Sequence, residues 1–259
     1  MDEALYLPRD DLYQPTRLTQ GPWSEGAQHG GPPAALLARA IEAESAPLPM
    51  QLVRLTVELM RPVPLDPLAV DVEVIRPGKR VRLVRASLLH EDVEVANAIA
   101  LQIRTDSMAV PESGERPPPG PDNGTAPTWP QRWPSGYHDT AVDMRFVAGD
   151  PSSPGPATAW IRLKVPVVAG EEPSGVQRAA AAADFGNGIS SVLDPARFVY
   201  INPDLTVYLH RKPRGEWICL EATTTGQPSG IGLAESALYD IDGAVGHSLQ
   251  GLLIGPATQ

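Results

Sequence analysis

The chain has 259 residues, with 31 acidic and 21 basic side chains and a formal net charge of −10 at neutral pH. At about 150 residues per domain this length allows one or two domains, and 42% hydrophobic residues are enough to form buried cores. The acidic balance and the 5% aromatic content argue against a nucleic-acid-binding protein, because such proteins present basic surfaces and aromatic stacking platforms. The single cysteine, Cys219, excludes an intrachain disulfide and a thiolate zinc site.

Several other classes of protein are disfavoured by simple patterns. The sequence has no run of about 18 apolar residues, and its first residues are acidic where a secretory signal would be basic. The five histidines show no metal-ligand spacing, and the glycines near the C-terminus are not followed by the Lys-Ser/Thr of a phosphate loop. We therefore expect a soluble, cytoplasmic protein without a membrane span, a metal or another cofactor.

The first half of the chain predicts one helix followed by strands. Residues 32–43 are rich in alanine and begin with proline, which favours the first position of a helix because its missing N–H would be unpaired there. Because small side chains allow close approach to a sheet, we expect this helix to be buried. Alternating apolar residues then predict strands, at 55–59, 70–74, 80–90 and 93–103.

Residues 109–136 contain eight prolines and four glycines, a composition that cannot hold a helix or a central strand. We predict a linker here, with Trp129 and Trp133 pinning it to a surface, between an N-terminal unit (1–108) and a C-terminal unit (137–259). The second unit predicts a buried helix at 176–184 and further strands, at 141–148, 157–168, 204–211, 216–225, 230–240 and 244–254.

The two halves carry an internal repeat. Residues 55–61 (LTVELMR) and 205–211 (LTVYLHR) share five of seven residues at an offset of 150. The same offset aligns the strands and turns of about fifty following residues. The pattern predicts a duplicated unit in which an antiparallel sheet packs on one helix, an α+β architecture.

The motifs in both halves resemble the acyl-CoA thioesterases of the double hotdog fold, including the thioesterase II type. In the first half they are Gly21-Pro-Trp, the segment 29–36 (HGGPPAAL) and the segment 74–85; in the second half they are 181–185 (AAADF), 203–211 and Glu216-Trp217. The resemblance covers nearly the whole chain outside the linker. It implies two antiparallel sheets, each wrapped around a central helix, an activity that hydrolyses acyl-CoA to fatty acid and coenzyme A, and assembly as a homodimer or higher homo-oligomer.

In that family an Asp, a Thr or Ser, and a Gln hold the attacking water. The resemblance implies that these are Asp204, Thr225 and Gln250, although a shift of one residue would select Thr224. The sequence departs from the family at Leu205, where a histidine often stands beside the Asp.

The repeat supplies an independent argument for one site per chain. At the 150-residue offset, the first unit has Arg54, Ile75 and Ala100 in place of the three polar residues. The three predicted side chains have suitable chemistry, since a desolvated Asp can act as a base and a hydroxyl and an amide can orient water. We expect Gly30 and Gly31 to supply oxyanion donors from the N-terminus of the first helix, where backbone N–H groups are unpaired.

Other interpretations stay open at this point. Five basic residues between positions 76 and 85 form either a solvated face or a site for the phosphates of coenzyme A; they are Arg76, Lys79, Arg80, Arg82 and Arg85. A non-catalytic acyl-CoA-binding protein is one alternative function. A hydratase is another, and it would require a histidine paired with a carboxylate near the helix start, where His29 has no adjacent acid in the sequence.

Overall fold

The structure, a computed structural model, describes residues 4–22, 24–111, 114–129, 134–194 and 196–257. Trp133 of the predicted linker and the tryptophan of the Gly21-Pro-Trp motif lie outside these residues. The elements in chain order are β1 (Tyr6–Arg9), β2 (Leu12–Pro15), η1 (Arg17–Thr19), α1 (Gly31–Ala43), β3 (Met50–Leu59), β4 (Leu68–Arg76), β5 (Val81–His90), β6 (Val93–Arg104), η2 (Pro121–Asn123), η3 (Tyr137–Ala141), β7 (Val142–Asp150), β8 (Ser153–Leu163), α2 (Gly175–Ala183), α3 (Gly186–Ile189), β9 (Phe198–Ile201), β10 (Asp204–Leu209), β11 (Trp217–Gly226), β12 (Ile231–Asp240) and β13 (Gly243–Pro256).

The strands of the described residues form one continuous sheet, in the order β1-β2-β4-β5-β6-β3-β10-β13-β12-β11-β8-β7, with β9 added beside β13. All the strand pairs are antiparallel. The expectation of two sheets is therefore wrong in one respect. Pairing of β3 with β10 joins the two half-sheets into one.

The strands of the two halves correspond at the offset that the repeat predicts. Strands β3, β4, β5 and β6 recur as β10, β11, β12 and β13, and the order β4-β5-β6-β3 is mirrored by β10-β13-β12-β11. At the junction Thr56 pairs directly with Thr206, its own repeat equivalent, and the two hydroxyl oxygens lie 3.3 Å apart. The halves are thus related by an approximate two-fold axis through this residue pair.

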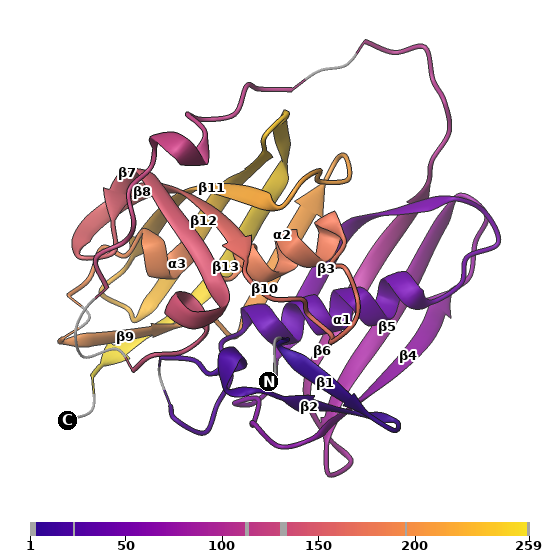
Figure 1. The fold of residues 1–259 in the computed structure, drawn as a ribbon, viewed down its shortest axis with the longest axis horizontal. Coiled ribbons are helices and arrows are strands. Elements are labelled where there is room, and N and C mark those ends of the chain that lie inside the picture. The colour runs from indigo at the N-terminus through magenta and orange to yellow at the C-terminus, as the bar shows by residue number, and fades with distance from the viewer. Residues whose placement is uncertain (1–3, 23, 112–113, 130–133, 195, 258–259) are drawn as a thin grey trace.

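Helices α1 and α2 lie side by side, each against the strands of its own half (Figure 1). Both are buried over most of their length, as their small side chains predict. Their close approach depends on Gly31, because a Cβ there would lie 2.6 Å from the backbone oxygen of Ala181. Ser174 caps α2 by accepting a hydrogen bond from the N–H of Gln177. The start of α1 therefore lies against the C-terminal end of α2.

Part of the proline-rich segment is attached to the outer face of the C-terminal half-sheet. The indole of Trp160 donates to the carbonyl of Pro119 over 2.7 Å, and the N–H of Ala244 donates to the carbonyl of Glu115. Trp160 packs there with Cys219 and Tyr239. The segment therefore covers a second, smaller apolar cluster, although it runs away from the molecule earlier along its path (Figure 1).

Three short strands were not predicted from the sequence. They are β1, β2 and β9, each of only four residues. The strand expected at 157–168 covers 153–163 instead. No helix among the described residues has the length and apolar character needed to cross a membrane.

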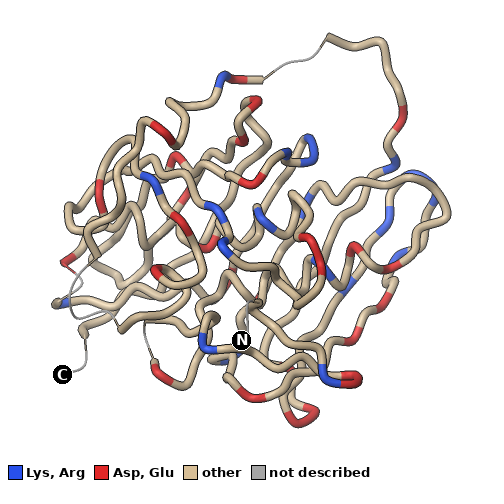
Figure 2. The backbone as a smooth tube through the Cα atoms, viewed as in Figure 1, with Lys and Arg blue, Asp and Glu red and all other residues tan. Residues whose placement is uncertain are grey.

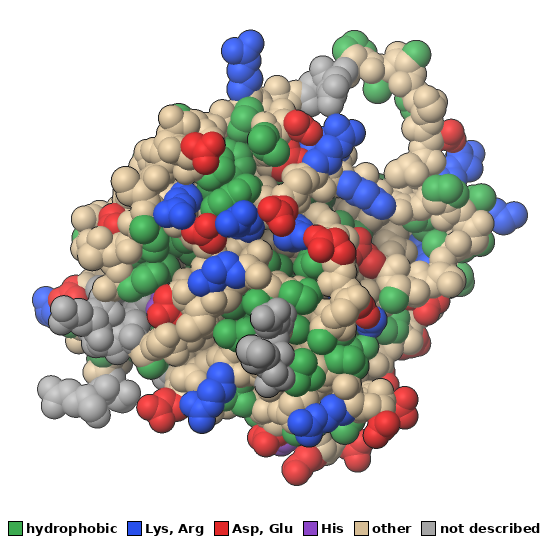
Figure 3. All heavy atoms as spheres, in the orientation of Figure 1, with side chains coloured by type: hydrophobic (Ala, Val, Ile, Leu, Met, Phe, Trp, Pro, Cys, Tyr) green, Lys and Arg blue, Asp and Glu red, His purple; other side chains and the backbone are tan. Residues whose placement is uncertain are grey.

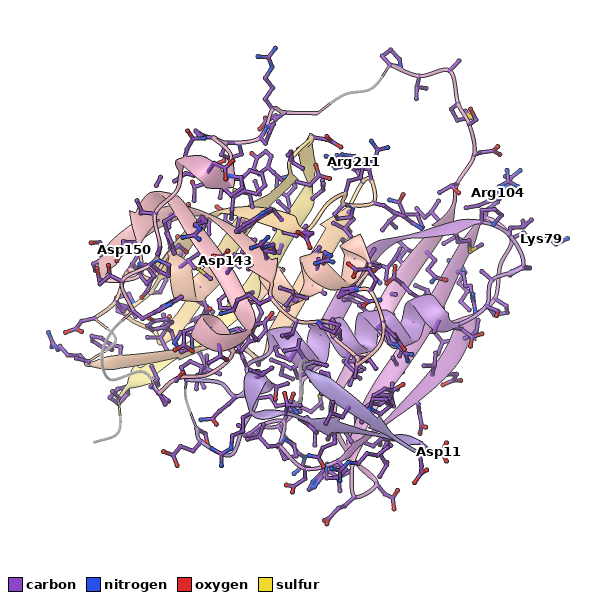
Figure 4. All side chains as sticks on the ribbon, in the orientation of Figure 1. Asp11, Lys79, Arg104, Asp143, Asp150 and Arg211 are labelled. Carbon is purple, nitrogen blue, oxygen red and sulfur yellow. The ribbon has the colours of Figure 1, made fainter. Side chains whose placement is uncertain are left out.

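Charges of both signs are spread over the molecule (Figures 2 and 3). Within the basic group of residues 76–85, Arg82 is buried against Glu44 and Arg85 pairs with Glu94. Lys79 lies at the far end of the β4–β5 turn (Figure 4). None of the five lines the main cavity described below, which argues against the site for the phosphates of coenzyme A. The alternative of a solvated face does not hold for Arg82, which is buried.

Candidate functional site

A cavity of about 470 Å³ lies where the two halves meet. Its wall combines residues of both halves: Gly21, Pro22, Ala27, Gln28, His29, Gly30 and 59–63 from the first, and 184, 185, 187, 188 and 201–203 from the second, with Trp129 and His138. Apolar side chains such as Leu59, Val63 and Phe185 make up much of it. Since ligand sites are typically apolar clefts with a few convergent polar groups, this cavity is the candidate site.

Asp184 is the acid of the cavity wall. It follows the last residue of α2 and is only 4% exposed. A carboxylate at this end of a helix faces the negative end of the helix dipole, and burying it costs free energy unless it is paired. A buried acid in such an unfavourable place needs strong partners.

Those partners are donors from three other segments. Nδ1 of His29 lies 2.7 Å from Oδ2, and Nδ2 of Asn202 donates to Oδ1 over 2.8 Å. Nε2 of Gln250 lies 3.3 Å from Oδ1, and the backbone N–H of Gly31 also points at the carboxylate. Burial acts to raise the pKa of Asp184, but His29, Asn202 and Gly31 outweigh it and hold that pKa below its usual value.

Gln250 is fixed on both ends of its amide. It projects from the inner face of β13 and is 1% exposed. Its Oε1 accepts from the N–H of Asn187, while its Nε2 donates to the carbonyl of Asp184. Gly186 makes room for this amide, because a Cβ there would lie 2.7 Å from Oε1. The structure therefore brings the predicted Gln250 into the cluster, with Asp184 and Asn202 as its companions.

His29 brings the first half into the same cluster. Its ring packs against Tyr137 and Phe185, with ring centroids 5.1 and 4.7 Å away, and these two rings stack on each other. The side chain lines the cavity and is 12% exposed. The sequence places no acid beside His29, which argued against a pair of histidine and carboxylate. That argument is wrong, because the fold brings Asp184 to His29 from the other half of the chain.

Asp204 and Thr225 do not join this cluster. On β10 the buried inner face carries Leu205 and Val207, so Asp204 points to the opposite face, where it accepts from the N–H of Gly251 over 2.7 Å. On β11 the same alternation leaves Thr225 exposed. The expectation that Asp204, Thr225 and Gln250 converge is therefore wrong, since only Gln250 faces inward.

Thr224, the alternative weighed from the sequence, does face inward but lies beneath α3. Its hydroxyl is 2.8 Å from that of Ser190, which donates to the carbonyl of Gly186. Thr224 is separated from Gln250 by β12, because Ala234 pairs with both residues. This threonine supports the loop that carries the site and is not part of the cavity wall.

We expect Thr225→Ala to leave any activity of this cavity within about twofold of wild type, because its side chain is in solvent. Thr224→Val removes one buried hydrogen bond and should lower the free energy of unfolding by about 1 kcal/mol. Steady-state assays and chemical unfolding of the two variants check these expectations. A large activity loss in Thr225→Ala alone would contradict the placement of the site.

The two predicted oxyanion glycines have different surroundings. The N–H of Gly31 is directed at the Asp184 carboxylate and at Nδ1 of His29, 3.2 Å away. Gly30 lines the cavity, and a Cβ there would lie 2.8 Å from Oδ2 of Asp184. Because Pro32 and Pro33 have no N–H, Gly30 is the remaining donor at the start of α1. Among the described residues, no group of three or more His, Cys, Asp or Glu could hold a metal ion.

Two residues of the cluster, Asp184 and Asn202, were missed as site residues. A sequence signal existed for Asp184, because a lone acid ends an alanine-rich helix expected to be buried, where neither burial nor the helix dipole favours it. Asn202 carried no such signal. It stands in the short link between β9 and β10, and only the fold brings it to Asp184.

Two family models match the chain. Residues 19–103 match the acyl-CoA thioesterase N-terminal domain, and residues 112–254 match the acyl-CoA thioesterase C-terminal domain. A search of curated protein sequences found no match.

Solved structures share the fold at low sequence identity. A hot dog fold protein of unknown function from Alicyclobacillus acidocaldarius is 16% identical, with 98% of this chain and 96% of that chain covered and a TM-score of 0.76. A protein from Novosphingobium aromaticivorans that is proposed to be a thioesterase is 20% identical, with 96% of this chain and 98% of that chain covered and a TM-score of 0.75. The acyl-CoA thioesterase II of Mycobacterium marinum is 15% identical, with 96% of this chain and 95% of that chain covered and a TM-score of 0.68. At these identities the likeness establishes the hot dog fold and not the activity.

Proposed function

Because the chain belongs to the acyl-CoA thioesterase family, we propose that it hydrolyses an acyl-CoA thioester in the cavity between its two halves, using Asp184, Asn202 and Gln250. This set replaces the Asp204 and Thr225 expected from the sequence. The observation that carries the proposal is the buried Asp184 carboxylate in an otherwise largely apolar cavity, held by hydrogen bonds from both amides.

The cluster has the parts that thioester hydrolysis needs. An apolar wall suits an acyl chain, and polar groups at one place in it can position a water molecule against the thioester carbonyl. The backbone N–H of Gly30 is our proposed donor to the oxyanion that forms when water adds. Arg61, exposed at the cavity wall, carries the charge best placed for the phosphates of coenzyme A.

One observation favours a second candidate function. The pairing of His29 with Asp184 is the arrangement that a hydratase of this scaffold would require, since it can activate water for addition to an unsaturated acyl-CoA. The same cavity would then bind an enoyl-CoA. We rank hydrolysis first because both family models that match the chain are thioesterase models.

The deciding experiment follows two reactions with the full chain. Acyl-CoAs of increasing length are assayed for free-thiol release, and the matching enoyl-CoAs are assayed for loss of the ultraviolet absorbance of the conjugated thioester. Hydrolysis predicts thiol release from saturated substrates. Loss of the enoyl absorbance without thiol release would instead identify a hydratase, and a thermal shift with neither reaction would identify a binding protein.

Assembly as a homodimer or higher homo-oligomer remains part of this proposal. Exposed apolar side chains on the outer face of the C-terminal half-sheet are consistent with it, among them Tyr208, Leu233 and Leu249. Sedimentation of the purified chain at several concentrations measures the oligomeric state directly.

A further inference from the structure

The Asp184 carboxylate is too fully engaged to be a good base. Oδ2 faces Nδ1 of His29, Oδ1 faces the amides of Asn202 and Gln250, and the N–H of Gly31 adds a further donor. A carboxylate that accepts several hydrogen bonds is stabilised in its charged form. Taking a proton from water would require one of these donors to leave, so the acid of the cluster is built to stay ionised.

The neighbouring imidazole is in the opposite situation. A carboxylate 2.7 Å from Nδ1 favours the tautomer with the proton on that nitrogen, and in this tautomer the N–H of Gly31, 3.2 Å from Nδ1, donates to the carboxylate. Nε2 is then the unprotonated, basic atom of the ring. The side chain lines the cavity, and the rings of Tyr137 and Phe185 hold its orientation. His29 therefore has an orienting acid on one side and the cavity beside it.

We propose that His29 is the general base of the reaction and that Asp184 acts through it as a positioning residue. The inference rests on the proposed thioester hydrolysis and assigns its proton transfers. It also makes the site a product of both halves, because the base comes from the first half and its orienting acid from the second.

The oxygen of water adds to the thioester carbonyl carbon while its proton moves to Nε2 of His29, which gives a tetrahedral oxyanion and an imidazolium stabilised by Asp184. The oxyanion then collapses, the C–S bond breaks, and the imidazolium returns its proton to the departing sulfur. The products are a carboxylic acid and the free thiol of coenzyme A, with His29 neutral again.

Two other titratable groups neighbour His29. Tyr137 packs against its ring, and the charge of His29 acts on His138. Burial lowers the pKa of His138 to about 4, with the charge of His29 adding to this effect and Asp139 opposing it. Burial raises the pKa of Tyr137 well above its usual value. His138 and Tyr137 therefore stay neutral near neutral pH and place no charge beside the ring of His29.

The test compares His29→Gln with wild type and with His247→Gln, in which an exposed histidine of β13 is changed. Glutamine can still donate to Asp184 but cannot act as a base. We expect kcat for thiol release to fall about 10²- to 10⁴-fold in His29→Gln, with KM changed by no more than about threefold. His247→Gln should match wild type. Near-wild-type kcat in His29→Gln would overturn the proposal.

Nitrogen-15 NMR of the substrate-free protein separates this inference from the proposed function. It should show the His29 ring protonated at Nδ1 in wild type and a changed tautomer balance in Asp184→Asn. If wild type released no thiol from any acyl-CoA while the Nδ1 tautomer was present, the hydrolase assignment would fail and the polarised His29–Asp184 pair would stand. Protonation at Nε2 in wild type would refute the pair itself.

Discussion

Asp184→Asn is expected to lower kcat for thiol release by about 10²- to 10⁴-fold. The substitution removes the negative charge that fixes the proton of His29, and it places an NH₂ group where Asp184 now meets only donors. Because the apolar cavity wall is unchanged, KM should shift much less than kcat. Steady-state thiol release with a saturating acyl-CoA measures the effect, and a thermal melt checks that the variant is folded.

Asp204→Asn is the matched control for this variant. Asp204 lies on the opposite face of the sheet and is the residue that the sequence resemblance selected, so both substitutions make the same chemical change in the same half of the chain. An asparagine oxygen can still accept from the N–H of Gly251. Activity within about twofold of wild type is expected. The reverse pattern, with Asp204→Asn inactive and Asp184→Asn active, would show that the site lies on the outer face of the sheet.

The second large effect is on stability and concerns Asp240, a fully buried carboxylate at the β12–β13 turn. Its two oxygens accept from the guanidinium of Arg211 over 2.5 and 2.6 Å and from the N–H groups of Arg214, Asp242 and Gly243 (Arg211 is labelled in Figure 4). Asp240→Ala is expected to lower the free energy of unfolding by about 3 to 5 kcal/mol, because it leaves buried donors without their acceptor.

Chemical unfolding measures this loss, with Asp242→Ala as control. Asp242 is exposed and lies 3.6 Å from the largely exposed Arg214, so its removal should cost less than about 1 kcal/mol. Equal losses in the two variants would show that the buried network around Asp240 adds nothing beyond a surface ion pair.

The contribution of Asp240 also has a defined pH dependence. Burial acts to raise the pKa of Asp240, but hydrogen bonds from Arg211, Arg214 and Asp242 prevail and lower it. A lowered pKa in the folded state means that ionised Asp240 stabilises the fold above its unfolded pKa of about 3.9, and that this contribution is lost as the pH falls through the folded value. The stability difference between wild type and Asp240→Asn should therefore shrink below about pH 4.

The fold was predictable from local patterns because each pattern has a local cause. The structure confirms the helix that begins with proline, the long strands with alternating residues, and the repeat at an offset of 150 residues. Pairing of β3 with β10 was not predictable, because it depends on which edges of two similar half-sheets meet. The four-residue strands β1, β2 and β9 are too short to show a period.

The site was predictable only where a residue had to face inward. Gln250 stands among leucines on β13, and an amide in such a place requires hydrogen-bond partners. Asp204 and Thr225 failed because strand alternation puts them on the outer face, which a shift of one residue reverses. The pairing of His29 with Asp184 joins residues 155 positions apart, and no sequence pattern indicates a contact at that separation.

The most direct test of the site is a crystal structure of the chain with an acyl-CoA analogue in which a methylene group replaces the thioester sulfur, so that its carbonyl cannot be hydrolysed. The predicted result places that carbonyl in the cavity between the halves, with a water molecule within hydrogen-bonding distance of Nε2 of His29, whose Nδ1 faces Asp184. An analogue bound elsewhere, with its carbonyl beside Asp204 or Thr225 on the outer face of the sheet, would contradict it.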